Sequence, residues 1–180
     1  MIKPLQVIHG LDLILRRKIG LVHEVNDEIR SLADMMIDII KIEKAPGLAA
    51  NMVGLSKRIV AINTSTSSQP SIVTLINPEV VNFSSENQSI EESSLCFPGI
   101  SAIIDRPKTV TVRYLDYNGE PEEFTAENSI STIIQRKIDY LDGKIYLDYL
   151  SKLKTDILLK KMHKHLRHPS PHVHSSSCRH

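Results

Sequence analysis

The sequence predicts a single α+β domain, with strand-forming segments in the middle of the chain and helices around them. Its 180 residues are 41% hydrophobic, which is enough to bury a sizeable core. Apolar residues recur at helical spacing over 27–43 and 127–141, whereas shorter segments between them have the composition and alternation of strands. The chain contains no internal repeat, so we expect one domain rather than an array.

The first helix is predicted to begin after Asn26, a residue type that caps helix N-termini well. Asp27 and Glu28 follow, and acidic side chains are favourable at the positive end of a helix. We expect the helix to run to about Glu43. Its apolar stripe is far more typical of a core-facing surface than of a cofactor site. The stripe consists of Ile29, Leu32, Ala33, Met36 and Ile40.

Strands are predicted next over 58–63 and 72–76, because both segments are rich in β-branched and other apolar residues. The segment 64–68 between them is rich in serine and threonine, which is typical of a loop. Asn77-Pro78 follows the second strand and predicts a turn.

The segment 108–115 alternates as a strand, and Asn118-Gly119 then carries the signal of a hairpin turn. The chain is expected to return as a helix over 127–141. The predicted inner face of this helix consists of Ile130, Ile133, Ile134 and Ile138.

From Lys152 onward the chain is basic, although its net charge is only +1. We expect an amphipathic helix that docks one face and exposes its lysines. The predicted docked face consists of Leu153, Ile157, Leu158 and Met162. Residues 165–180 lack apolar periodicity and are rich in histidine and serine, so we expect a disordered tail after a domain at 1–164.

Histidines crowd the end of the chain beside Cys178, and a tract of this kind can bind Ni or Zn loosely in vitro. We interpret the tract as a chance extension beyond an ancestral stop codon rather than as the metal-binding segment of a metal carrier. The histidines are His163, His165, His168, His172, His174 and His180.

Three short segments carry the chemistry that the sequence suggests. They are Ala45-Pro46-Gly47-Leu48-Ala49-Ala50-Asn51-Met52-Val53-Gly54, Glu91-Glu92-Ser93-Ser94-Leu95-Cys96-Phe97-Pro98-Gly99 and Gln135-Arg136-Lys137-Ile138-Asp139-Tyr140-Leu141-Asp142-Gly143. In order and approximate spacing they resemble the peptide deformylase signatures G-x-G-L-A-A-x-Q, E-G-C-L-S-x-P and Q-H-E-x-D-H-L-x-G.

The resemblance extends over about residues 5–164 and implies a peptide deformylase-like fold. In that fold, small mixed or antiparallel sheets surround the helix that carries the third motif. A helix near the N-terminus and a basic C-terminal helix accompany them.

The family's functional side chains fall on five positions of this sequence, and all five are replaced. The metal-binding cysteine falls on Ser94, and the two metal-binding histidines fall on Arg136 and Tyr140. The catalytic glutamate falls on Lys137, and the glutamine that assists the oxyanion falls on Met52. The resemblance therefore implies a degenerate member that lacks the family's chemistry.

The replaced residues are poor metal ligands, because structural and catalytic zinc sites use thiolate, imidazole and carboxylate groups. Cys96 would share a face with Ser94 if that segment were extended. One thiolate without an imidazole partner still does not make a metal site. We therefore expect no metal, no cofactor and no deformylase activity.

Another mechanism in the same cleft stays open as an alternative, namely hydrolysis of formylated peptides or other amides. Ser94 would need a base to become a nucleophile, and no histidine lies between Val25 and Met162. Lys137 would serve only if burial lowered its pKa. We favour a polar cluster in which Arg136, Lys137 and Tyr140 pair with carboxylates, with Glu91, Glu92 and Asp139 as the candidate partners.

Peptide binding is a separate expectation, because a groove that recognises backbone can persist without catalytic groups. Pro46 has no N–H to offer, and Ala45 replaces the family's first glycine, so both weaken the expectation of formyl-methionyl peptide binding. The residual groove would be formed by Pro46, Gly47, Leu48, Leu95 and Cys96.

Partners are suggested only by the basic C-terminal helix, because a helix of this kind helps bacterial deformylases to dock on the ribosome. The resemblance thus implies a contact with the ribosome or a nascent peptide, although a solvated lysine face is the simpler interpretation. The sequence has no specific nucleic-acid motif, no apolar run that spans a membrane and no signal peptide. We therefore expect a cytoplasmic location, and we expect no internal disulfide.

Three interpretations follow. The chain is a catalytically inactive deformylase homologue, an enzyme that uses altered chemistry, or a protein that binds metal through its tail. The five replacements favour the first of these.

Overall fold

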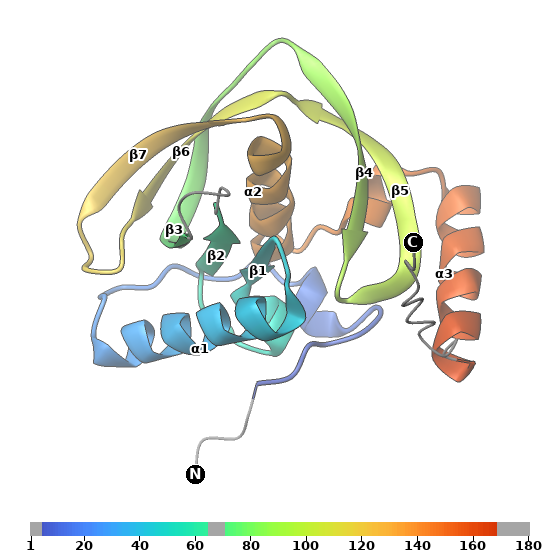
Figure 1. The fold of residues 1–180 in the computed structure, drawn as a ribbon, viewed down its shortest axis with the longest axis horizontal. Helices are drawn as coiled ribbons and strands as arrows, with labels where there is room; N and C mark the ends of the chain where they lie inside the picture. Colours follow the sequence, from blue (N-terminus) through green and yellow to red (C-terminus); the bar gives the residue numbers. More distant parts are fainter. Residues whose placement is uncertain (1–4, 65–70, 169–180) are drawn as a thin grey trace, which may run out of the picture.

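The computed structural model describes residues 5–64 and 71–168, and within them it shows the predicted α+β class. Helix α2 (Asn128–Leu141) lies in the middle of the molecule, between a five-stranded sheet and the hairpin β4–β5 (Figure 1). Helix α1 (Asp27–Glu43) packs below strands β1 and β2, and helix α3 (Lys152–Arg167) packs on the outside of β5. The helix that carries the third motif is therefore enclosed by the rest of the fold.

The larger sheet is antiparallel and has the order β1-β2-β3-β6-β7. Strand β2 is buried on both faces, and the buried residues of β3 lie in its first half. Helices α1 and α2 contact β2, and α2 also contacts β3. The β6–β7 pair is the predicted Asn-Gly hairpin, with Gly119 at φ 88°. The strands are β1 (Gly47–Ala49), β2 (Ile59–Asn63), β3 (Ile72–Phe83), β6 (Thr109–Leu115) and β7 (Pro121–Glu127).

The smaller sheet consists of β4 (Asn87–Ser94) and β5 (Phe97–Pro107), which form a long antiparallel hairpin. It arches over α2 and continues at its far end into β3 and β6 (Figure 1). The second motif occupies the tight end of this hairpin. The first and third motifs lie in β1 and α2, so the fold brings all three motifs to one region.

Helix α1 has the predicted limits, and the Asn26 side chain accepts a hydrogen bond from the backbone N–H of Ile29 at 3.1 Å. Four of the five predicted stripe residues are buried, and Leu32 is half-buried. The prediction for α2 is wrong in one respect: its buried surface is much wider than the four isoleucines. Gln135, Arg136 and Lys137 are also buried, because the sheets and hairpin surround the helix on nearly every side.

The turn predicted at Asn77-Pro78 is wrong, because β3 continues through both residues. A β-bulge between Ile76 and Glu79 absorbs the irregularity, with Asn77 in the left-handed region at φ 53°. The Asn77 amide both donates to the carbonyl of Val22 and accepts from its N–H, each at 2.8 Å. Two side-chain hydrogen bonds thus favour a bulge over a chain reversal. Most of the loop predicted at 64–68 lies outside the described residues.

Helix α3 begins after the N-cap Ser151 and packs on β5 through Met162, which is buried. The predicted docked face is wrong for Leu153 and Ile157, which are 71% and 57% exposed. A single strand beneath the helix contacts only a narrow stripe of it. The helix extends to Arg167, and the remainder of the predicted tail, residues 169–180, lies outside the described residues.

Three short 3₁₀ helices complete the described part of the chain, and they are η1 (Leu13–Arg16), η2 (Ala50–Val53) and η3 (Tyr146–Tyr149). The N-terminal segment joins the first two motifs through backbone bonds. Ile8 donates to the carbonyl of Met52 at 2.8 Å, and Gly10 donates to that of Cys96 at 2.7 Å. Within the described residues, no helix is both long and apolar enough to cross a membrane.

Candidate functional site

The five replaced positions converge in space, as the motif comparison requires. Met52 lies in η2, Ser94 ends β4, and the other three lie on one stretch of α2. The Lys137 amine contacts the Met52 thioether at 3.5 Å, and the Tyr140 and Ser94 hydroxyl oxygens are 2.7 Å apart. Three segments distant in sequence therefore meet at one centre, at the tight end of the β4–β5 hairpin.

Lys137 occupies the middle of this centre and is 2% exposed. Its ammonium group faces a thioether, which is a weak acceptor, and the Tyr140 ring at 5.5 Å. Burial, together with the nearby Arg136 charge, lowers the pKa of Lys137 to about 7. Among the described residues no carboxylate lies within ion-pair distance of its Nζ. The prediction that Lys137 pairs with an acidic side chain is therefore wrong.

Ser94, Tyr140 and Cys96 form a second, largely uncharged part of the centre. The Ser94 Oγ accepts a hydrogen bond from the backbone N–H of Cys96 at 3.2 Å. Burial raises the pKa of the Cys96 thiol to about 11, and burial also holds the pKa of Tyr140 well above its usual value. Both groups are therefore protonated at neutral pH. The segment turns at Leu95 and Cys96 rather than continuing as a strand, so the extended geometry considered for Cys96 is not formed.

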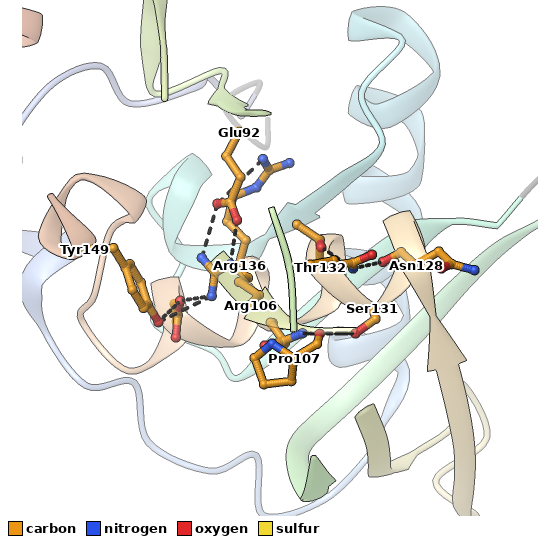
Figure 2. Close-up of polar contacts among 11 residues, drawn as sticks. Glu92, Arg106, Pro107, Asn128, Ser131, Thr132, Arg136 and Tyr149 are labelled. Atoms are coloured by element: carbon orange, nitrogen blue, oxygen red, sulfur yellow. Dashed lines mark hydrogen bonds and ion pairs between the residues drawn. The ribbon is translucent and has the colours of Figure 1, made fainter. Parts of the chain in front are cut away.

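Arg136 lies beside Glu92, but a different arginine holds that carboxylate. Figure 2 shows the Glu92 carboxylate between the guanidinium groups of Arg106 and Arg136. Arg106 donates two hydrogen bonds to Glu92, at 2.5 and 3.1 Å, and one to Asp139 at 2.7 Å. Arg136 approaches Glu92 only to 4.0 Å. Of the predicted pairs, only that of Arg136 with Glu92 is present, at this long distance. The prediction is wrong for Asp139, which pairs with Arg106, and for Glu91, which accepts a hydrogen bond from Ser101.

Arg106 was not identified as a site residue from the sequence. Its signal was present: it shares a face of β5 with the buried Ile104, and an inward-pointing arginine requires a buried carboxylate. Burial lowers the pKa of the Arg106 guanidinium, but its bonds with Glu92 and Asp139 outweigh that effect and raise it above its ordinary value. The ring of Tyr149 covers the guanidinium at 4.6 Å (Figure 2).

The start of α2 is fastened to the hairpin by a second polar contact. The Gln88 side-chain amide on β4 donates to the Asn128 carbonyl at 2.7 Å and to the Thr132 hydroxyl at 3.0 Å (Figure 2). The other end of α2 is fixed by Asn51, whose side-chain amide donates to the Tyr140 carbonyl at 2.6 Å. Arg136, Lys137 and Tyr140 are therefore carried on a helix that is held at both ends.

The residues of the predicted peptide groove lie along β1 and the hairpin turn. Gly47 and Leu48 are buried in β1, Pro46 is exposed just before it, and Leu95 is half-buried. An added Cβ at Gly47 would meet the Ile133 side chain at 3.1 Å, so β1 and α2 are in close contact there. The backbone N–H of Ala49 lies 3.4 Å from the Met52 sulfur. The Met52 side chain thus lies against a backbone donor at the end of β1.

Two cavities near this centre are not lined by any of the five replaced positions. A cavity of about 550 Å³ beside the N-terminal segment includes Leu95 but none of the five. Another of about 340 Å³ opens on the other side of α2, next to Arg106 and Asp139. Met52, Lys137 and Tyr140 are almost completely buried and pack against one another at this centre.

The metal that the family implies does not suit the groups present. A guanidinium stays protonated in proteins and cannot donate an electron pair, and a serine hydroxyl and a tyrosine of raised pKa are poor replacements for thiolate and imidazole. Across residues 5–64 and 71–168, no three histidine, cysteine, aspartate or glutamate side chains are grouped to hold a metal ion. The donor set at this centre therefore does not match a divalent cation.

Among the described side chains of this centre, no nucleophile contacts a base. Ser94 is bonded to a tyrosine hydroxyl and not to a base, and Cys96 is a thiol at neutral pH. Lys137 has a pKa suited to proton transfer, but its amine contacts the Met52 sulfur. The arrangement can hold charge and donate hydrogen bonds, whereas it offers no nucleophile and base in contact.

Comparisons with known proteins agree with the motifs and the fold. The polypeptide deformylase family model matches residues 4–156. The chain is 46% identical over 175 residues to a protein of Rickettsia conorii named peptide deformylase-like, with 97% of this chain and 96% of that protein covered. It is 35% identical over 164 residues to the peptide deformylase of Rhizobium meliloti, with coverage of 91% and 93%.

A solved structure extends the agreement to three dimensions. The crystal structure of peptide deformylase from Ehrlichia chaffeensis superposes with a TM-score of 0.86 at 32% identity, and 92% of this chain and 98% of that chain are covered. Sequence, fold and motif order thus lead to one conclusion: this chain belongs to the polypeptide deformylase family.

Proposed function

We propose that this protein is a non-catalytic member of the deformylase family. In it, charged and polar side chains replace the metal centre. The observation that carries the proposal is the pair Arg136 and Lys137, two basic side chains buried where the family places a metal ligand and its catalytic glutamate. Two unit positive charges about 4 Å apart repel by roughly 4 kcal/mol at an effective dielectric of 20. A divalent cation beside them would be repelled more strongly.

The proposal is also supported by what the replacements do for the fold. Arg136 faces Glu92, Tyr140 bonds to Ser94, and Met52 contacts both the Ala49 N–H and Lys137. Each replacing side chain therefore contributes to a packed interior. A centre that is filled in this manner leaves no described cavity for a formylated N-terminus.

One observation favours the alternative, an amide hydrolase of altered mechanism. Lys137, with a pKa of about 7, is half-deprotonated at neutral pH and would be a competent general base if its surroundings moved. That mechanism requires Lys137 for turnover. A Lys137→Met variant would abolish it, whereas a contaminating deformylase would leave activity unchanged.

Deformylation of a formyl-methionyl peptide is the direct test, and a restored variant supplies the positive control. The variant carries Met52→Gln, Ser94→Cys, Arg136→His, Lys137→Glu and Tyr140→His, which returns the family's side chains to the five positions. We expect no turnover above buffer for the natural chain, and metal binding with measurable turnover for the restored one. Turnover by the natural chain, lost on Lys137→Met, would overturn the proposal.

Metal content must be measured so that the histidine tract does not confuse the result. A cut before His163 would divide α3, so truncation after His168 is preferable, since α3 ends at Arg167. We expect less than about a tenth of an equivalent of Zn or Fe on the truncated natural chain after anaerobic purification. A full equivalent that survives the truncation would place a metal in the folded domain and contradict the proposal.

A ribosome or nascent-peptide contact through α3 stays a prediction. Its support is the exposed basic surface of α3, which comprises Lys152, Lys154, Lys160, Lys161 and Lys164. Cosedimentation with ribosomes should fall steeply as salt rises if these lysines contact RNA phosphates. Replacing three of these lysines by acidic residues should abolish the cosedimentation. Unaltered cosedimentation would mean that another surface of the protein contacts the ribosome.

A further inference from the structure

The cavity of about 340 Å³ lies over the C-terminal end of α2. It is lined by three residues of the helix, Gln135, Ile138 and Asp139, and by its C-cap residue Asp142. Their spacing places them on one face of α2. The C-terminal end of a helix carries a partial negative charge, and α2 has no basic residue in its last turn. The helix therefore presents its negative end to this cavity.

Gln135 offers a hydrogen-bond acceptor to the cavity. Its amide nitrogen donates to the Pro107 carbonyl and to the Ser131 hydroxyl, each at 2.9 Å, but its oxygen has no partner among the described residues. Unlike the Arg136 Nε, that oxygen is not closed off from solvent, although Gln135 as a whole is only 6% exposed. The two bonds of the amide nitrogen hold the side chain in place. A fixed, unpartnered oxygen is therefore available to a ligand in the cavity.

Three carboxylates line the same cavity, and each has at least one oxygen without a partner among the described residues. All hydrogen bonds to Asp139, including that from Arg106, use its Oδ2. Asp142 binds Arg58 through Oδ1 alone. Glu79, on β3, has no ion-pair partner among the described residues. The two arginines that line the cavity are thus already paired, whereas oxygens of all three carboxylates are available.

Two aromatic rings border the cavity beside these oxygens. Phe83 and Tyr149 are 54% and 48% exposed, so a flat cation can reach them from solvent. The Tyr149 ring already covers one guanidinium, that of Arg106, at 4.6 Å (Figure 2). Lys144 also lines the cavity and opposes a cation, but it is exposed, and its flexible side chain can turn toward solvent.

We propose that this cavity binds a guanidinium group, carried either by a free alkylguanidine or by an arginine side chain. Asp139, Asp142 and Glu79 supply the opposite charge, and the Gln135 oxygen is a further acceptor. A guanidinium has five donors in one plane and is more weakly hydrated than an ammonium group, so it suits several acceptors beside an aromatic ring. Among the described residues, no three acidic, histidine or cysteine side chains are grouped as metal ligands, which favours an organic cation.

Ethylguanidinium and N-ethylurea are the matched probes, because they have nearly the same shape and differ in charge. The full chain, labelled with nitrogen-15, is titrated with each probe at constant ionic strength set by sodium chloride. The side-chain amide signal of Gln135 is followed by proton–nitrogen correlation spectroscopy. We expect a saturable shift with ethylguanidinium and none with N-ethylurea. Equal shifts with the two probes, or no saturable shift with ethylguanidinium, would overturn the site.

Substitutions of opposite charge at two exposed lining positions should change the affinity in opposite directions. Glu79→Gln should weaken ethylguanidinium binding by at least about threefold, and Lys144→Gln should tighten it by a similar factor. Glu123→Gln is the control, because Glu123 is exposed, pairs with Arg113 and does not line the cavity. Equal effects of the two glutamate substitutions, or weaker binding after Lys144→Gln, would contradict the site.

A peptide-like probe, N-acetylarginine N-methylamide, separates the two sources of the guanidinium. Tighter binding of this probe than of ethylguanidinium indicates an arginine side chain, and the reverse order indicates a free alkylguanidine. Ethylammonium tests the choice of cation, and its binding more tightly than ethylguanidinium would contradict the guanidinium assignment. None of the five replaced positions lines the cavity, so the inference is independent of the proposed function.

Discussion

Replacing Lys137 by methionine should stabilise the protein, which is unusual for a substitution at a buried position. The Lys137 ammonium has no carboxylate partner within the described residues, and it contacts Met52 and the Tyr140 ring. Methionine has a similar length and no charge, so it removes the cost of burying the amine while it fills the same space. The loss of a cation–π contact opposes the gain by about 0.5–1 kcal/mol.

The size of the effect follows from the lowered pKa. A fall from 10.5 to about 7 corresponds to a cost of about 5 kcal/mol for burying the protonated amine, as an order of magnitude. Between these two pH values the unfolded chain binds a proton at Lys137 that the folded chain has released. The free energy of unfolding therefore rises with pH through this window, by up to about 1.4 kcal/mol per pH unit from this group.

Urea unfolding at pH 7, 8 and 9, in buffers free of carboxylates, measures both the stabilisation by Lys137→Met and the pH dependence of the free energy of unfolding. We expect Lys137→Met to be more stable than the natural chain by about 2–5 kcal/mol at pH 7, and the gap to narrow as pH rises. Lys152→Met, at an exposed lysine paired with Asp156, is the control and should not alter the pH dependence. A less stable Lys137→Met protein with the natural pH slope would refute the reasoning.

Two other substitutions test contacts that stabilise the fold around the five replaced positions. Arg106→Leu leaves the buried Glu92 carboxylate without its main partner, and should lower the free energy of unfolding by about 3–5 kcal/mol in urea titrations; a loss below 1 kcal/mol would mean that Arg136 takes over the carboxylate. Gly143→Ala should cost about 1–3 kcal/mol, because Gly143 has φ 77° and an added Cβ would lie 2.6 Å from the Arg16 carbonyl oxygen. In the control variant Gly20→Ala, the added Cβ meets no atom within 4 Å, so its effect on stability should be near zero. Thermal melts of both glycine variants measure the two effects, and an equal loss of stability in both would contradict the argument.

Local signals were sufficient for much of the fold. Asn26 fixed the start of α1 through a hydrogen bond to the next turn, and the Asn118-Gly119 pair fixed the β6–β7 hairpin. These signals act over a few residues, so they can be recognised without knowledge of distant contacts. Asn77-Pro78 was misinterpreted because the Asn77 side chain bonds to Val22, which is remote in sequence and favours a bulge.

The sequence by itself determined the family, the α+β class and the identity of the five replaced side chains, because motif order and residue type are properties of the chain alone. It also implied that those side chains meet. Tertiary structure alone decided which charges are satisfied: Arg106, on another strand, takes the Glu92 carboxylate, and Lys137 is left against a thioether. Ion pairing depends on distances of a few ångströms between segments that no local pattern relates, and for that reason the charge balance of this centre became visible only in the folded protein.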